Sequence, residues 1–202
     1  ITGNVVDNAT LVFDRSNTLT FAGLISGTGA VSQIGAGTTI LTANNTYAGG
    51  TTISSGVLQL GNGGTTGGVT GNILDNASLS IDRSDTLSLA GIISGSGSLS
   101  QDGTGTTVLL GNDTYAGGTT INFGTLQIGA NGTTGSIVGN VLDNAILAFD
   151  RSDTYTYSGV VSGTGALNQI GSGTTILTGA NTYGGGTTIS AGTLQLGNGG
   201  TT

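Results

Sequence analysis

The chain has 202 residues, a net charge of −7 and 41 glycines, and it contains no His, Cys, Pro, Met or Trp. Without His and Cys, a Ser-His-Asp triad, a disulfide framework and a thiolate metal site are excluded. Because the only cations are three Arg residues, we expect no nucleic-acid partner. No apolar run approaches the roughly 20 residues of a membrane helix, so we expect no membrane insertion of this segment.

The sequence repeats with a period of 68 residues. The motif Asp14-Arg15-Ser16 returns at positions 82–84 and again at 150–152, without insertion or deletion. We therefore divide the chain into repeat units of residues 1–68, 69–136 and 137–202, which form one continuous solenoid. The third unit is two residues short of a full period, which indicates a segment of a longer array.

Each unit contains short strand-like runs bounded by Gly, Asn and Ser. In chain order, the first unit has such runs at residues 10–13, 18–21, 38–41 and 57–60, which are rich in β-branched residues and mostly alternate apolar with polar. We interpret the runs that start at Leu11, Val31 and Leu58 as one strand on successive coils, with starts 20, 27 and then 21 residues apart. This interpretation predicts an all-β parallel β-helix with about three coils per unit and about nine coils in all, the longest coil carrying the turn at residues 45–50.

The alternation also predicts which side chains face inward. We expect the core to contain nine apolar residues of the first unit and their equivalents 68 and 136 positions later: Leu11, Phe13, Leu19, Phe21, Val31, Ile40, Ile53, Leu58 and Leu60. A one-residue slip would reverse the faces. We also expect Gln33, Gln101 and Gln169 to point inward and to bond to backbone, because a buried amide without partners costs about 1–3 kcal/mol.

The last part of each unit resembles a known repeat family. In the third unit the runs Gly171–Tyr183, Gly185–Ser190 and Gly192–Gly199 resemble the autotransporter-associated β-strand repeat, also called the passenger-associated transport repeat. The resemblance covers roughly half of each unit and occurs three times. Two departures are Gly184, where the other units have Ala48 and Ala116, and Asp113, where they have Asn45 and Asn181.

This resemblance implies a right-handed β-helical passenger of a large Gram-negative protein that is outer-membrane anchored or secreted. It implies a rigid stalk on the bacterial surface that displays adhesive modules and assists secretion. Glycans or host surfaces would then be bound by other parts of the parent protein. The alternative is a subunit segment of a self-assembling extracellular filament or sheath. A β-helical carbohydrate-processing enzyme is a third class, which the lack of catalytic residues disfavours.

We identify no catalytic, cofactor-binding or metal-ligating residue, and we expect neither enzyme activity nor a cofactor. Asp14, Asp82 and Asp150 are candidate sugar or calcium ligands, but we favour a structural corner in which the Asp accepts turn amides and the Arg covers an apolar edge. Tyr47, Tyr115 and Tyr183 could stack on sugars, yet we favour packing against a turn.

The ends of the segment carry no atypical capping coil, because the first and third units are as regular as the second. Uncovered coils would expose unpaired strand edges, which bind other strands. The partners that we expect are therefore the neighbouring repeats of the same chain, with head-to-tail association of the isolated segment.

Overall fold

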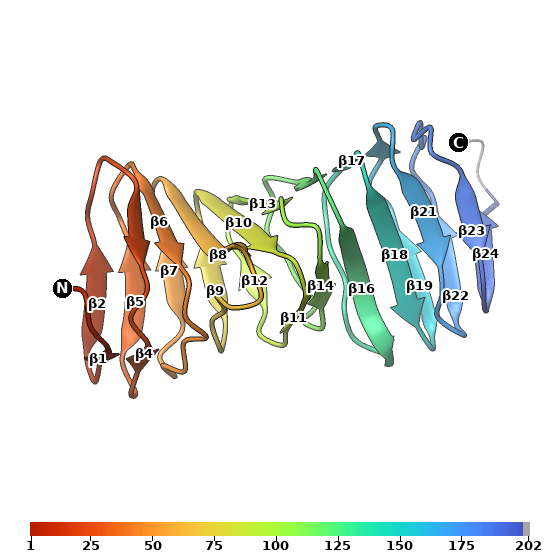
Figure 1. Cartoon of the computed structure of the whole chain (residues 1–202). Coiled ribbons are helices and arrows are strands. Elements are labelled where there is room, and N and C mark those ends of the chain that lie inside the picture. The colour runs from red at the N-terminus through yellow and green to blue at the C-terminus, as the bar shows by residue number, and fades with distance from the viewer. Residues whose placement is uncertain (200–202) are drawn as a thin grey trace.

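The computed structural model describes residues 1–199, so the last three residues of the third unit lie outside the described part. Residues 1–199 form 24 short strands that pair in parallel, coil upon coil, along one axis from the N-terminus to the C-terminus (Figure 1). None of the described elements is a helix of the length and apolarity needed to cross a membrane. The structure is therefore the all-β parallel solenoid that the sequence predicts.

The strands lie on three faces of this solenoid, which we number first, second and third in the order in which the chain reaches them. The third face is a continuous eight-stranded sheet of β3 (Leu19–Phe21), β6 (Thr38–Leu41), β8 (Val57–Gly64), β10 (Ser78–Arg83), β13 (Ser98–Gln101), β15 (Thr119–Ile121), β17 (Val141–Asp143) and β20 (Val161–Ser162). Because this sheet runs without a break from the first unit into the third, it joins all three units into one body.

The first face consists of two sheets. The shorter sheet holds β1 (Val5–Val6) and β4 (Ile25–Ser26), and the longer holds β11 (Thr86–Leu89), β14 (Thr106–Leu109), β16 (Thr125–Gly132), β18 (Ile146–Arg151), β21 (Ala166–Gln169) and β23 (Thr187–Ile189). Between the two sheets, the ladder continues only as an isolated parallel bridge from Asn44 to Gly68.

The second face is also made of two sheets. Its strands are β2 (Thr10–Phe13), β5 (Ala30–Gln33), β7 (Thr51–Ile53), β9 (Ile73–Asp75) and β12 (Ile93–Ser94), followed by β19 (Thr154–Tyr157), β22 (Thr174–Leu177) and β24 (Thr193–Leu196). Here the gap contains the bridge from Asn112 to Ser136, which is the 68-residue equivalent of the bridge on the first face.

A repeat unit does not correspond to a whole number of coils. The first unit supplies eight strands, β1 to β8, and the two bridge segments at Asn44 and Gly68, so it has ten strand positions on three faces, or three and one-third coils. The prediction of about three coils per unit is therefore close to the observed number, and the solenoid has about ten coils rather than nine. Equivalent strands consequently move to a new face in each unit, as β2, β10 and β18 do.

The strand pairing corrects the predicted coil lengths. Val31 pairs with Thr51, not with Leu58, and Leu58 pairs with Thr39 and Leu79. Paired residues on these strands are therefore 19 to 22 positions apart, and the coil of 27 residues does not exist. The extra residues of the unit lie in the loop after β8, where the register between β8 and β10 shifts, and not in the turn at residues 45–50.

The core prediction holds in most positions. In the middle unit all nine predicted residues are buried, and in the first unit Leu11 and Leu19 are partly buried while Phe13 and Phe21 are buried. Ile40 and Ile176 were assigned to the wrong face: the inward positions are Thr39 and Leu41, and likewise Thr175 and Leu177.

Two predicted core residues in the last described coils are exposed. The exposed fractions of Ile189 and Leu196 are 54% and 76%, because no described coil packs on them. Their equivalents Ile53, Leu60, Ile121 and Ile128 are buried between neighbouring coils. The inward direction of these strands is therefore right, and burial requires the next coil.

The inward glutamines are confirmed. Gln33, Gln101 and Gln169 are buried, and each donates its side-chain amide to the carbonyl two residues later at 2.8 Å. In the first two units the amide oxygen also accepts a hydrogen bond from an inward threonine, Thr39 or Thr107. Each glutamine thus ties a strand to the corner that follows it.

We expect Gln101→Leu to lower the free energy of unfolding by about 1–3 kcal/mol. Leucine matches the volume but leaves the Gly103 carbonyl and the Thr107 hydroxyl without their buried partner. Urea unfolding followed by circular dichroism measures this loss. The control is Gln195→Leu, because Gln195 lies exposed on β24; equal losses at both positions would contradict the role of the buried amide.

Candidate functional site: junction clamps and buried carboxylates

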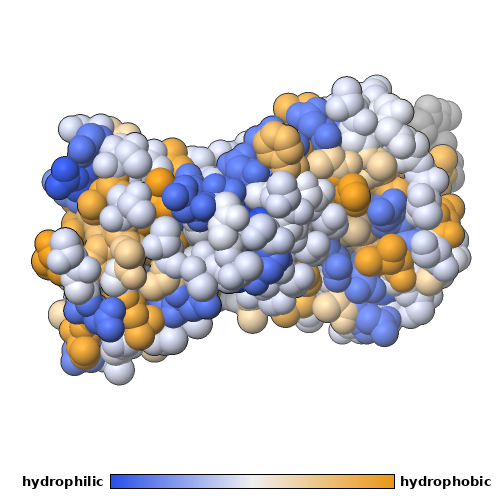
Figure 2. Space-filling view, in the orientation of Figure 1, coloured by the Kyte–Doolittle hydropathy of each residue, from blue (hydrophilic) through white to orange (hydrophobic). Residues whose placement is uncertain are grey.

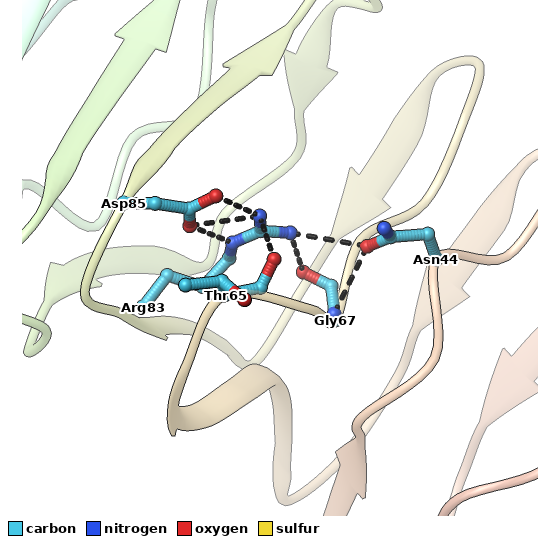
Figure 3. Close-up of polar contacts among 5 residues, drawn as sticks. All are labelled: Asn44, Thr65, Gly67, Arg83 and Asp85. Carbon is cyan, nitrogen blue, oxygen red and sulfur yellow. Dashed lines mark hydrogen bonds and ion pairs between the residues drawn. The ribbon is translucent and has the colours of Figure 1, made fainter.

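An arginine joins the first repeat unit to the second. Arg83, at the end of β10, is 6% exposed, and it reaches back to the loop after β8 (Figure 3). Its Nη1 donates to the Gly67 carbonyl at 2.9 Å and to Asn44 Oδ1 at 3.1 Å, and its Nη2 donates to the Thr65 carbonyl. We call this set of contacts the junction clamp, because Arg83 belongs to one unit and its loop partners belong to the unit before.

A carboxylate holds the guanidinium of the clamp in place. Nε and Nη2 of Arg83 donate to the Asp85 carboxylate at 2.9 Å and 2.8 Å. This two-point pairing fixes the plane of the guanidinium, so that its other N–H groups point at the loop carbonyls. Asn44 completes the arrangement by accepting from the Gly67 backbone amide at 3.1 Å.

The same clamp joins the second unit to the third. Arg151 donates to the carbonyls of Gly135 and Thr133 at 2.6 Å each, and it pairs with Asp153 at 2.8 Å. Its guanidinium carbon also lies 5.0 Å from the centre of the Tyr155 ring, a favourable cation–π contact. The hydrogen bonds from Arg151, and to a smaller degree its positive charge, lower the pKa of the Asp153 carboxyl.

Arg15 is the equivalent residue of the first unit and makes no such clamp. It is exposed, and its Nε donates to Asn17 Oδ1 at 3.0 Å. Asn17 stands where the other units have Asp85 and Asp153. Arg15 therefore provides an internal reference for an arginine in the same sequence motif without a loop to bind.

The clamp differs in detail from the corner that we expected. Asp82 and Asp150 accept side-chain amides from the coil before, Gln59 at 3.4 Å and Gln127 at 3.0 Å, rather than turn amides. Arg83 and Arg151 bind backbone carbonyls of the junction loops, which the expected corner did not include. Asp14 follows β2, whereas Asp82 and Asp150 lie within β10 and β18. Because these three strands belong to three different faces, the carboxylates do not line up along one edge.

The repeated tyrosines are core residues. Tyr47 and Tyr115 are fully buried, and their hydroxyls lie 2.7 Å from the hydroxyls of Thr51 and Thr119. Burial raises the pKa of Tyr47 to about 12. Tyr183, in the last coils, is partly buried and keeps the equivalent contact with Thr187 at 2.6 Å. The packing role that we favoured agrees with this placement, although the rings lie in the core rather than on a turn.

Three carboxyl groups at equivalent corners are buried. Asp7, Asp75 and Asp143 each accept the backbone amide two residues later at 3.0 Å, while their second oxygen, Oδ2, is buried without a partner. Burial raises the pKa of Asp75 and of Asp143, and backbone amides offset part of this shift. Sequence reasoning missed these groups, because an Asp-Asn dipeptide at a corner has no distinguishing pattern.

The described residues contain no group of three or more metal-ligating side chains that could hold an ion. Two surface hollows lie in the end coils, one lined by residues such as Leu177, Tyr183 and Leu196, and the other by residues such as Val5, Leu11 and Phe21. Both are walled by side chains whose equivalents fill the core in the middle of the solenoid. The arrangement is that of a structural repeat, with its polar groups used to join coils.

Comparison with known proteins supports this class. Residues 31–60, 99–128 and 167–196 match the family model of the passenger-associated-transport-repeat, so the chain contains three copies of that repeat. Each copy starts on a strand that carries an inward glutamine, and the first two copies end on β8 and β16, the strands before the two junction loops. The fold and the repeat together indicate a structural, non-enzymatic role.

One curated relative is an autotransporter adhesin. The chain is 42% identical over 171 residues to the "Adhesin BmaC autotransporter" of Brucella suis biovar 1 (strain 1330). The match covers 74% of this chain and 5% of the relative, so the chain spans a small part of that protein's length. No solved structure matches the chain. The chain is thus homologous to part of an autotransporter adhesin passenger, which indicates a cell-surface or secreted location.

Proposed function

We propose that this segment is a rigid spacer in a large bacterial surface or secreted protein, where it extends adhesive modules away from the cell and assists passenger secretion. The observation that carries the proposal is the continuity of the solenoid: the third face crosses both unit boundaries as one sheet, and a junction clamp closes each boundary. Each unit contacts its neighbours through strand pairing, so that added units lengthen the rod. Binding to glycans or host surfaces is assigned to other parts of the parent protein.

Measurement of array length tests the spacer role. We expect small-angle X-ray scattering to show that the maximum dimension of a six-unit array exceeds that of the three-unit chain by about 48 Å, which is ten coils at ~4.8 Å. A matched array with flexible Gly/Ser segments of equal length between the units is the control. A six-unit array whose maximum dimension does not grow, or one as flexible as the control, would contradict a rigid spacer.

As an alternative, we propose a segment of a self-assembling filament, and the strand pairing between successive units supports it. In the chain, β9 pairs with β7 and β10 pairs with β8. The equivalent strands β1 and β2 of a second copy could pair in the same way with β23 and β24. We expect the isolated 202-residue segment to form end-to-end oligomers that electron microscopy can detect. A stable monomer at high concentration, measured by light scattering, would exclude this assembly.

A further inference from the structure

At one position the middle repeat has a carboxylic acid where the other two have an amide. Asn45 and Asn181 of the outer units are replaced by Asp113, and all three side chains accept the backbone amide of a strand residue 20 positions earlier. For Asp113 this bond runs from Ile93 N to Oδ1 at 2.7 Å. The shared bond shows that the three side chains occupy the same place in the fold.

The second atom of each side chain makes the difference. In the first unit the Nδ2 of Asn45 donates to the carbonyls of Ala43 and Gly68 at 2.9 Å and 3.0 Å. The equivalent carbonyls around Asp113 are those of Gly111 and Ser136, and Ser136 O accepts the backbone amide of Asp113 at 2.8 Å. Oδ2 of Asp113 is buried without a hydrogen-bond partner, and an ionised carboxylate has no proton to donate to these carbonyls.

We propose that Asp113 is a neutral carboxylic acid in the folded protein, which donates its single O–H to one of these carbonyls, and that its ionisation makes the middle repeat a pH-sensitive joint in the solenoid. The acid then replaces the asparagine amide as a donor, and loss of the proton leaves a buried charge facing carbonyl oxygens. This joint goes beyond the proposed spacer role and does not depend on it.

The surroundings of Asp113 supply no counter-charge. The segments that pack against it, β12 (Ile93–Ser94) and residues 135–138, contain no charged residue. The ionisable groups near it are Tyr115 and Tyr155, whose own pKa values are raised by burial and, to a smaller degree, by the charge of Asp113. The nearby loop cation, Arg151, is paired with Asp153.

Burial raises the pKa of Asp113 to about 7, and the bond from Ile93 offsets part of this shift. Between about pH 4 and pH 7 the folded protein therefore keeps a proton on Asp113. The unfolded chain has lost this proton, because an ordinary Asp has a pKa near 3.9. Stability contributed by the neutral acid is complete below about pH 4 and decreases as the pH rises towards 7. Over that window the equilibrium constant for unfolding increases by up to about tenfold per pH unit because of this one group.

The test compares the 202-residue chain with two single substitutions across pH 4–8, by urea unfolding at low protein concentration. Asp75 and Asp143 contribute a pH dependence that is common to all three proteins. Asp113→Asn restores the residue of the other units. We therefore expect the slope of its unfolding free energy against pH to correspond to close to one fewer bound proton than in the natural chain. Asn45→Asp places an acid at the matched position of the first unit, and we expect it to add a similar dependence.

A direct reading of the carboxyl group keeps the test independent of folding stability. We expect the ¹³C chemical shift of the Asp113 carboxyl, assigned by its loss in Asp113→Asn, to titrate near neutral pH in the folded chain. Equal pH dependence of unfolding in the natural chain and Asp113→Asn would overturn the proposal. So would an Asp113 carboxyl that titrates near pH 4 in the folded state.

Discussion

We expect Arg83→Met to lower the free energy of unfolding by roughly 2–4 kcal/mol. Methionine keeps much of the length and apolar stem of arginine but donates no hydrogen bonds. The carbonyls of Thr65 and Gly67 and the Asp85 carboxylate would lose a partner that is almost completely buried. Because the clamp joins two units, its loss should also reduce the cooperativity of unfolding between them.

The first unit provides the matched control for this substitution. Arg15 lies in the same motif but is exposed and contacts Asn17 only by one side-chain bond, so Arg15→Met should change stability by no more than about 0.5 kcal/mol. Arg83→Lys should recover little, because a lysine ammonium lacks the planar fork that pairs with Asp85 and the loop at once. Urea unfolding measures all three variants, and equal effects of Arg83→Met and Arg15→Met would contradict the clamp.

Gly95→Ala should destabilise the chain by roughly 3 kcal/mol or more. Gly95 follows β12 at a corner of the coil and has a φ of 112°, which L side chains rarely adopt. A Cβ atom there would lie 2.1 Å from the Asp75 carbonyl oxygen of the preceding coil. Neither backbone can move away easily, because the carbonyl of Asp75 accepts the amide of Gly97 at 2.8 Å.

Gly64→Ala is the control for this second prediction. A Cβ atom on Gly64 would have no neighbour within 4 Å, and its φ lies outside the positive range that strains L residues. We therefore expect Gly64→Ala to leave the thermal midpoint nearly unchanged, while Gly95→Ala lowers it strongly or prevents folding. A Gly95→Ala protein as stable as Gly64→Ala would show that the corner is looser than the contacts indicate.

The strands and the inward glutamines could be predicted from sequence because their signals are local. Alternation across Leu58-Gln59-Leu60 defines a buried face without knowledge of the rest of the fold. Asp102, directly after Gln101, indicates that this next position faces water, so that the glutamine before it faces inward. The prediction that Ile40 faces the core is wrong. In Thr38-Thr39-Ile40-Leu41 the inward residues are Thr39 and Leu41, and counting apolar residues alone overlooks an inward threonine.

The extra third of a coil in each repeat unit could not be predicted in this way. Strands β5 and β8 look alike, yet β5 pairs with β7, whose Thr51-Thr52-Ile53 sequence has a weak apolar signal. Pairing the two similar strands directly gives a whole number of coils and a false 27-residue coil. On the face that Figure 2 shows, apolar and polar residues are interspersed and form no continuous apolar stripe.

The junction clamp was missed because its partners are backbone carbonyls of Thr65 and Gly67, which have no sequence signature. A signal was nevertheless present: arginine is the sole cation type in the chain, and it returns at the same place in each unit. Burial of a solitary arginine requires acceptors, and the aspartate two residues later in the second and third units supplies one of them.

Disulfide trapping tests the central structural claim most directly, and the absence of native cysteines makes its background clean. Ser100 and Thr120 are directly paired on the third face, so cysteines at these two positions should form a disulfide on mild oxidation of the folded chain. Cysteines at Ser100 and Gln127 should not, because β13 and β16 lie on different faces. Crosslinking of the Ser100–Gln127 pair, with none between positions 100 and 120, would contradict the rotation of equivalent strands by one face per repeat.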